Sequence, residues 1–143
     1  MKNLSDVERN LLNSIVTNDN NIIIGNRALI NCKKFSAYTD NMNFRTQNYT
    51  IRYLNLSSYK YGIVKRFYYI NNEIYALMQI LIKAKNFVSD QTIEEELNKY
   101  FLICLLSEEY EIIHFKKIDT KCVLLKNQNE YFVPVCNLLN EHD

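Results

Sequence analysis

Residues 61–82 read YGIVKRFYYI-NN-EIYALMQILI and predict a β-hairpin around which the rest of the chain packs. The Asn71-Asn72 pair fits a two-residue turn in which both central residues need positive φ, and asparagine tolerates that backbone. In the second arm apolar residues occupy both faces, and Gln79 is the one polar interruption. A strand of this kind belongs in the middle of a sheet or barrel. Gly62 interrupts the first arm, where a lone glycine predicts a bulge or sharp bend.

Shorter strand patterns flank this hairpin. Tyr49, Ile51 and Tyr53 alternate with polar residues, which is typical of a half-buried strand. Residues 55–60 are expected to form a connector, 40–48 a polar loop and 126–129 a hairpin turn. Further strands are predicted at 22–24, 28–32, 110–115, 121–125 and 130–135, and Pro134 favours an edge position for the last of them. Short strands at about ten-residue spacing indicate a small β-barrel or sandwich.

Two segments are predicted to be helical. Leu4–Val16 carries one apolar stripe at helical spacing, and Ser5 followed by Glu8 fits a capping box. We expect this helix (residues 1–17) to pack on a single mainly β domain (residues 20–143), although an oligomer contact is a second interpretation. Ser89-Asp90 can cap a second, short helix. Residues 92–106 fit either an extension of that helix or a buried strand, and we expect a strand over 100–106.

Composition limits the classes of function. The 143 residues carry a net charge of +1, which does not favour strong binding to duplex DNA. No run of 18 apolar residues indicates a transmembrane helix, and the first ten residues have no apolar signal core, so we expect an intracellular protein. Four cysteines form no C-x-x-C pair and only two histidines exist, so neither a metal site nor a cofactor is predicted.

No group of residues predicts catalysis. Cys122 has His114 and Asp119 as sequence neighbours, but it lies in an apolar strand pattern without the surroundings that lower a thiol pKa. Glycine-rich phosphate loops and calcium loops are missing from the sequence. We therefore expect a protein without enzyme activity, and a Cys122–His114 site is a remote alternative.

Basic and aromatic residues adjoin each other on the first hairpin arm. The candidate binding residues are Lys65, Arg66, Tyr68 and Tyr69. Exposed aromatic rings beside basic groups can stack on bases and meet phosphates, and clustered tyrosines can enclose a methylated ammonium group. Core packing with solvated charges is the simpler interpretation of the same residues, and the sequence favours it.

Five blocks of the chain, from residue 22 onward, resemble a known protein family in their order. They are IIIGNRALINCKKFSAYT, YTIRYLN, YGIVKRFYYINNEIYALMQIL, IIHFKKIDTKCVLL and YFVPVCNLLNEHD. In order and spacing they resemble a C-terminal accessory domain of proteins encoded by animal DNA transposons and of their domesticated relatives. His114 departs from the pattern, which has proline there, and the acidic catalytic core of a transposase is missing from this sequence.

The resemblance implies a bromo-adjacent homology (BAH) type of barrel, so we expect an SH3-like or BAH-like distorted barrel with an N-terminal amphipathic helix. It also implies an accessory module, either cut from a larger protein or descended from one. The expected function is non-enzymatic binding of a protein or histone-tail partner, with a nuclear location favoured over a cytoplasmic one. DNA binding as an accessory domain, and an oligomerisation or structural role, are the alternatives.

Overall fold

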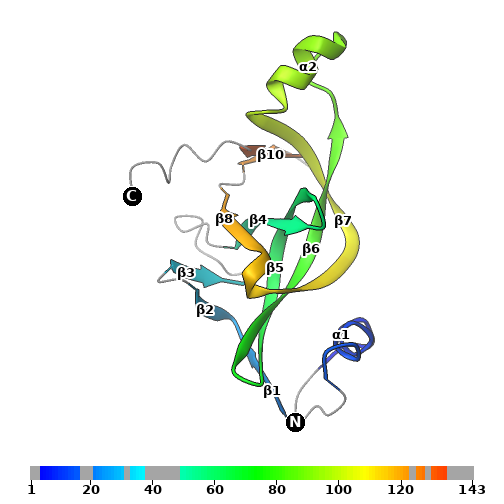
Figure 1. Ribbon diagram of the computed structural model, residues 1–143. Helices are drawn as coiled ribbons and strands as arrows, with labels where there is room; N and C mark the ends of the chain where they lie inside the picture. The colour runs from blue at the N-terminus through cyan, green and yellow to red at the C-terminus, as the bar shows by residue number, and fades with distance from the viewer. Residues whose placement is uncertain are drawn as a thin grey trace.

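The computed structural model describes residues 4–16, 21–30, 33–37, 49–122, 125–127 and 130–134. Figure 1 shows long strands in the middle of the molecule, with one helix toward each end of them. The elements in chain order are α1 (Asp6–Leu12), β1 (Ile22–Gly25), β2 (Arg27–Ile30), β3 (Lys33–Ser36), β4 (Thr50–Asn55), β5 (Ser58–Ile70), β6 (Glu73–Lys85), α2 (Gln91–Leu97), β7 (Phe101–His114), the 3-10 helix η2 (Phe115–Lys117), β8 (Ile118–Lys121), β9 (Leu125–Asn127) and β10 (Glu130–Pro134). The predicted mainly β class and the N-terminal helix are confirmed. The predicted loop 40–48 lies outside the described residues.

The sheet is an antiparallel meander with the predicted hairpin at its centre. Its strand order is β8-β4-β5-β6-β7-β10-β9. In addition, β1 pairs with the C-terminal end of β5. Ile70 pairs with Glu73, so the turn has two residues, and Asn71 and Asn72 have φ of 51° and 67° as predicted. Ala76, Leu77 and Met78 are all buried, which confirms that β6 is covered on both faces.

A β-bulge divides β5, and it lies at Lys65 rather than at Gly62. Val64 pairs with Met78 and Arg66 pairs with Leu77, so Lys65 is an extra residue without a partner on β6. An extra residue reverses the alternation of side chains along a strand. Gly62 pairs regularly, and the bulge predicted there is wrong. It is instead a position of close approach, because an added Cβ would lie 2.9 Å from the carbonyl oxygen of Gln79.

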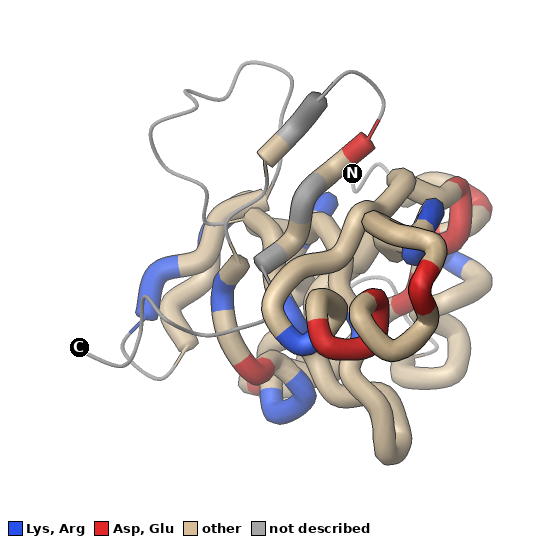
Figure 2. The backbone as a smooth tube through the Cα atoms, turned by 90° about the horizontal axis from the view of Figure 1, so that it is seen from above, with Lys and Arg blue, Asp and Glu red and all other residues tan. Residues whose placement is uncertain are grey.

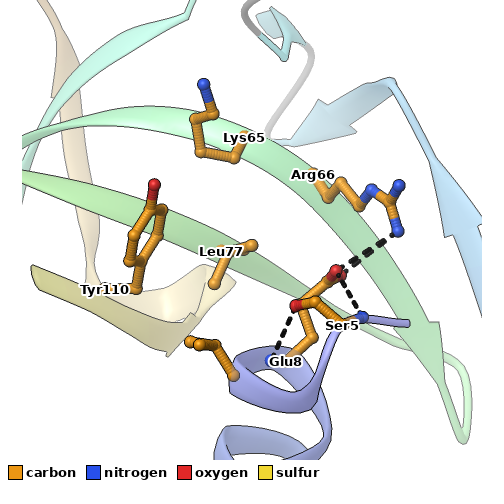
Figure 3. A pocket seen from close by; sticks show the side chains of 7 residues that line it. Ser5, Glu8, Lys65, Arg66, Leu77 and Tyr110 are labelled. Atoms are coloured by element: carbon orange, nitrogen blue, oxygen red, sulfur yellow. Dashed lines mark hydrogen bonds and ion pairs between the residues drawn. The ribbon is translucent and has the colours of Figure 1, made fainter. Parts of the chain in front are cut away.

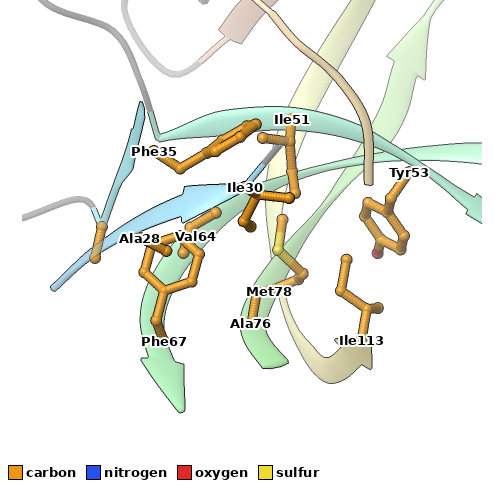
Figure 4. Close-up of a cluster of buried hydrophobic side chains, with 11 residues drawn as sticks. Ala28, Ile30, Phe35, Ile51, Tyr53, Val64, Phe67, Ala76, Met78 and Ile113 are labelled. Atoms are coloured by element: carbon orange, nitrogen blue, oxygen red, sulfur yellow. The ribbon is translucent and has the colours of Figure 1, made fainter. Parts of the chain in front are cut away.

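One face of the meander is covered by the β2–β3 hairpin. Figure 4 shows Ile30 and Phe35 of this hairpin above Val64 and Met78 of the long strands. The largest side chains of the cluster are completely buried, and each contributes about 1.5–3 kcal/mol through removal of its apolar surface from water. The buried members are Ala28, Ile30, Phe35, Ala37, Ile51, Tyr53, Val64, Phe67, Ala76, Met78 and Ile113.

The opposite face of β6 contributes to two other clusters. Leu12 of α1 is 2% exposed and packs with Tyr68 and Leu77, so the apolar stripe of the helix lies against the sheet. Leu81 belongs to a cluster that also includes Cys104. The domain is therefore a sheet with apolar clusters on both sides, and α1 covers part of one side.

The sheet rolls without closing. After β7, the 3-10 helix η2 turns the chain, and β8 pairs with β4, the first strand of the meander. The hydroxyl of Tyr53 on β4 donates to Glu111 on β7 at 2.5 Å. Burial, and then the Glu111 carboxylate, raise the pKa of Tyr53 above its ordinary value. Among the described strands no ladder joins the two edge strands, β8 and β9, so the predicted barrel is not closed.

Several boundaries differ from the predictions. The strands predicted at 100–106 and 110–115 are parts of one 14-residue strand, β7, which begins at Phe101 and ends at His114. At the irregularity between them, the Ser107 hydroxyl donates to the Ile80 carbonyl at 2.6 Å and keeps β7 attached to β6. The predicted connector 55–60 contains only a two-residue turn, since Asn55 already pairs with Ser58.

The final strand is not at the edge of the sheet. β10 lies between β7 and β9, so the edge position predicted for it is wrong over residues 130–132. Pro134 itself pairs with Phe101 of β7.

Candidate functional site

A pocket of about 320 Å³ lies between α1 and the outer surface of β5, β6 and β7. Figure 3 shows Leu77 between Tyr110 on one side and the Arg66–Glu8 pair on the other. The lining combines two basic groups and one carboxylate with apolar surface. Its residues are Ser5, Val7, Glu8, Lys65, Arg66, Leu77 and Tyr110.

Glu8 fixes one wall of this pocket. Its backbone N–H donates to the Ser5 hydroxyl at 3.2 Å and its carboxylate accepts from the Ser5 N–H at 3.1 Å, which confirms the predicted capping box. Glu8 as a whole is 7% exposed, and its carboxylate accepts a hydrogen bond from the Tyr68 hydroxyl and pairs with Arg66 at 3.3 Å. Glu8 therefore caps the helix and also joins it to the sheet.

The bulge in β5 brings Lys65 and Arg66 to the same pocket. Neighbouring residues of a regular strand point to opposite faces. Lys65 is the extra residue of the bulge, and both side chains line the cavity although they are adjacent in sequence. Both are partly buried, and the Arg66 side chain is 34% exposed. The two predicted basic residues thus lie together.

The two predicted aromatic residues do not join them. Tyr68 is completely buried, and burial, followed by its hydrogen bond to Glu8, raises its pKa above the ordinary value. Tyr69 packs against the cluster on the other face, where its hydroxyl donates to the Arg27 carbonyl at 2.5 Å. Tyr61 is buried too. These tyrosines therefore form no aromatic cage, and Tyr68 is a core residue.

Cys122 and His114 lie in different surroundings. Burial raises the pKa of the Cys122 thiol to about 11. His114 is 2.9 Å from a Glu73 carboxylate oxygen, and its Nδ1 accepts from the Lys116 N–H at 3.2 Å. Both residues belong to the described part of the chain, and no hydrogen bond joins them. The geometry that the remote nucleophile prediction requires is therefore not found.

Sequence reasoning missed most of the apolar and acidic lining. Glu8 was expected only as a helix cap, while Leu77 and Tyr110 were expected only as strand residues. Their shared pocket depends on contacts between segments that are far apart in the chain, and no local pattern reports such contacts. Among the described residues, no group of three or more His, Cys, Asp or Glu side chains could hold a metal ion.

Comparison of the chain with protein-family models, curated proteins and solved structures gives no match in any of the three. Within the described segments no helix is long and apolar enough to cross a membrane. In Figure 2, acidic positions lie among the basic ones along the described chain. The pocket lined by Lys65 and Arg66 is the candidate functional site of this domain.

Proposed function

We propose that this domain is a non-catalytic interaction module that binds a protein partner at the pocket beside α1. The observation that carries the proposal is the convergence of Lys65 and Arg66 on a cavity whose other walls include Leu77 and Tyr110. A polar rim with an apolar floor suits a peptide side chain, which buries apolar surface and pairs its charge.

The charges of the lining favour an acidic partner. Lys65 and Arg66 supply two positive charges and Glu8 supplies one negative charge, so the lining carries an excess of one positive charge. The Glu8 carboxylate already accepts from Ser5, Arg66 and Tyr68, so it has little capacity to bind a basic tail. We therefore favour a segment with an acidic residue next to an apolar one, rather than a histone tail.

A fluorescent peptide series tests this proposal. Acidic-apolar peptides, with neutral and basic counterparts, are titrated against the chain while amide shifts are recorded. We expect saturable shifts at Lys65, Leu77 and Tyr110 with the acidic peptides, and loss of binding in Lys65→Glu. Lys83→Glu, at an exposed lysine on the β6 end, is the matched control and retains binding. Equal binding of basic peptides would contradict the proposed charge preference.

DNA binding is the alternative function of the same basic pair. It is less favoured because Glu8 lies within the site and the net charge is +1. Tight, salt-sensitive binding of a duplex that is lost in a Lys65→Glu/Arg66→Glu variant would establish it. The helix-mediated oligomer is also less favoured, since the apolar stripe of α1 packs on its own sheet.

The proposed origin rests on the resemblance of the five sequence blocks to the accessory domain of transposon-encoded proteins. A transposase core upstream in the same reading frame would support that origin. A chromatin role and a nuclear location are further parts of this proposal. Imaging of a fluorescent fusion tests the location, and an even distribution between nucleus and cytoplasm would contradict it.

A further inference from the structure

Basic side chains from two distant segments of the chain gather on the side of the sheet that the β2–β3 hairpin covers. Residues 27–30 and 33–37, together with residues 115–122, include six basic residues and one acidic residue. Since the whole chain has a net charge of +1, these segments carry an excess of five positive charges and the rest of the chain an excess of four negative charges. We call the six basic residues the basic face; they are Arg27, Lys33, Lys34, Lys116, Lys117 and Lys121.

The core beneath the hairpin brings the two segments side by side. Figure 1 shows β3 beside β8, and the Lys121 ammonium nitrogen lies 5.3 Å from the centroid of the Phe35 ring. Phe115 of η2 and Ile118 of β8 pack against the buried cluster to which Phe35 belongs. A lysine precedes or follows each of these three core residues in the sequence, so the lysines surround the cluster at the surface.

The β2–β3 hairpin directs its own basic residues outward. Ala28 and Phe35 stand opposite each other and are buried, so the alternate positions of both strands point away from the core. Arg27 and Lys34 occupy that outer face and are exposed, as is Lys33 at the end of the hairpin. Three positive charges of this hairpin therefore face solvent.

The lysines of β3 and η2 are not neutralised by neighbouring acids. Asp119 is the one acidic residue in these segments, and it pairs with Arg52. Within the part of the chain that the structure describes, no ion pair or hydrogen bond holds the ammonium group of a lysine of β3 or η2. An anion that approaches this surface therefore meets charges that have no acidic partner.

The composition of the basic face favours phosphates over a protein surface. Five of its six residues are lysines, whereas protein–protein interfaces are depleted in lysine. The lysine ammonium is a compact point charge that suits phosphate oxygens. Phe35 is buried and Phe115 packs against the core, so the rings next to these lysines are not available for stacking on unpaired bases. Recognition of single strands and of RNA depends largely on such stacking, so a DNA duplex fits this surface better.

A lipid surface also fits the basic face less well. Leu29 is 62% exposed on the outer side of the hairpin, and it is the one exposed large apolar side chain among the described residues of these segments. Stable attachment to a membrane needs an apolar anchor in addition to a polybasic patch, and a single leucine is a weak anchor.

We propose that the basic face binds the phosphate backbone of a DNA duplex. Phosphate contacts carry no base information, so binding is independent of sequence. The expected dissociation constant is about 10⁻⁴–10⁻⁶ M at physiological salt, the range of non-specific binding, which agrees with the low net charge of the whole chain. The basic face and the pocket beside α1 lie on opposite sides of the sheet, so this function is additional to peptide binding and can be tested separately.

The salt dependence of binding is the first test. The full chain is titrated into a fluorescently labelled duplex of about 20 base pairs, and anisotropy is recorded from about 50 to about 200 mM salt. If about four to six cations meet phosphates, the logarithm of the association constant falls against the logarithm of salt concentration with a slope of about −3.6 to −5.4, and affinity drops about 150- to 1,800-fold over this range. Two duplexes of unrelated sequence should bind within about threefold of each other. Absence of binding at the lowest salt concentration, or a slope near zero, would overturn the proposal.

Charge reversals on the two segments locate the site. Lys116→Glu/Lys117→Glu on η2 and Lys33→Glu/Lys34→Glu on β3 should each weaken binding about 10- to 100-fold at the lowest salt concentration. Each should also make the slope less steep by about 1.8. All four side chains are exposed, so both variants should melt at the same temperature as the wild-type chain. Unchanged affinity in both folded variants would contradict the assigned face.

Two controls separate this site from a general effect of charge and from the pocket. Lys83→Glu/Lys99→Glu changes the net charge by the same amount at exposed lysines outside the basic face, and it should alter DNA affinity less than about threefold. An equal loss in this control would overturn the assigned face. Lys65→Glu/Arg66→Glu should likewise retain DNA binding while it loses peptide binding. Loss of DNA binding in this pocket variant, but not in the η2 variant, would overturn the proposal in favour of the pocket as the DNA site.

Other polyanions are compared with the DNA duplex under the same conditions. Single-stranded DNA, an RNA duplex, polyglutamate and phosphatidylcholine vesicles that contain phosphatidylserine are the probes. Each is expected to bind more weakly than the DNA duplex. Tighter binding of any one of them, lost in the η2 variant, would overturn the choice of a DNA duplex in favour of that partner.

Discussion

Among the acidic residues of α1, Glu8 should destabilise the domain most when it is replaced with alanine. The carboxylate has three roles in the structure. It completes the capping box with Ser5, accepts from the buried Tyr68 hydroxyl and pairs with Arg66. A seven-residue helix is marginal by itself, so α1 depends on such contacts with the sheet.

The expected cost follows from these three contacts. An unsatisfied buried hydroxyl at Tyr68 costs about 1–3 kcal/mol, and loss of the capping contact costs about 0.5–1 kcal/mol. The pair with the partly exposed Arg66 adds about 0–1 kcal/mol. We therefore expect Glu8→Ala to lower the free energy of unfolding by about 1.5–5 kcal/mol, which is a large part of the stability of a domain of this size.

A double-mutant cycle measures the buried contact. Tyr68→Phe removes the hydroxyl, so adding it to Glu8→Ala should recover about 1–2 kcal/mol relative to the sum of the single changes. Urea unfolding followed by circular dichroism gives each free energy. Glu108→Ala, at an exposed glutamate of β7, is the control and should cost less than about 0.5 kcal/mol. Strict additivity, or a Glu8→Ala cost near that of the control, would refute the linking role of Glu8.

Three other predictions concern the β5–β6 hairpin and the buried thiols. Gly62→Ala places a Cβ 2.9 Å from the Gln79 carbonyl oxygen, so denaturant unfolding should show a loss of about 1–3 kcal/mol; an unchanged midpoint would contradict the close approach. Asn72→Gly creates the Asn-Gly pair that this turn class prefers, and thermal melting should show a small gain, about 0.5 kcal/mol; a lower melting temperature would count against the turn assignment. Burial raises the pKa of the Cys104 and Cys122 thiols from 9.0 to about 11, so the unfolded chain releases these protons first. Stability that is complete below about pH 9 should fall as the pH rises toward 11, by about 1.4 kcal/mol per pH unit for each thiol, and unfolding titrations at several pH values measure this; a flat profile would mean that the thiols are not buried in solution.

The sequence predicts best those features that depend on few neighbouring residues. The turn at Asn71-Asn72, the capping box of Ser5 and Glu8 and the helix cap at Asp90 each depend on residues within one turn of one another, and all three are found in the structure. The central position of β6 also follows from a local property, since its side chains are apolar on both faces.

Features set by pairing between strands could not be predicted in this way. The residue that bulges out of β5 is decided by which β6 residues lie opposite, and residues 61–70 are amphipathic enough to permit several registers. The sequence therefore groups Tyr68 and Tyr69 with Lys65 and Arg66, whereas the structure buries Tyr68 and turns Tyr69 to the other face. The pocket needs α1 and β7 together, and no local pattern links Glu8 to Tyr110.

The bulge at Lys65 has a consequence for how this hairpin can change. Val64 and Phe67 are three residues apart, so in a regular strand they would face opposite sides. They reach the same core only because Lys65 is an extra residue between them. Deleting Lys65 would leave Val64, Arg66 and Phe67 opposite Met78, Leu77 and Ala76 in an unbroken ladder, so Phe67 and Tyr69 would keep the faces that they have now. Lys65 should therefore be the position at which β5 can lose a residue, whereas a deletion after Phe67 would turn the residues that follow it to the wrong face.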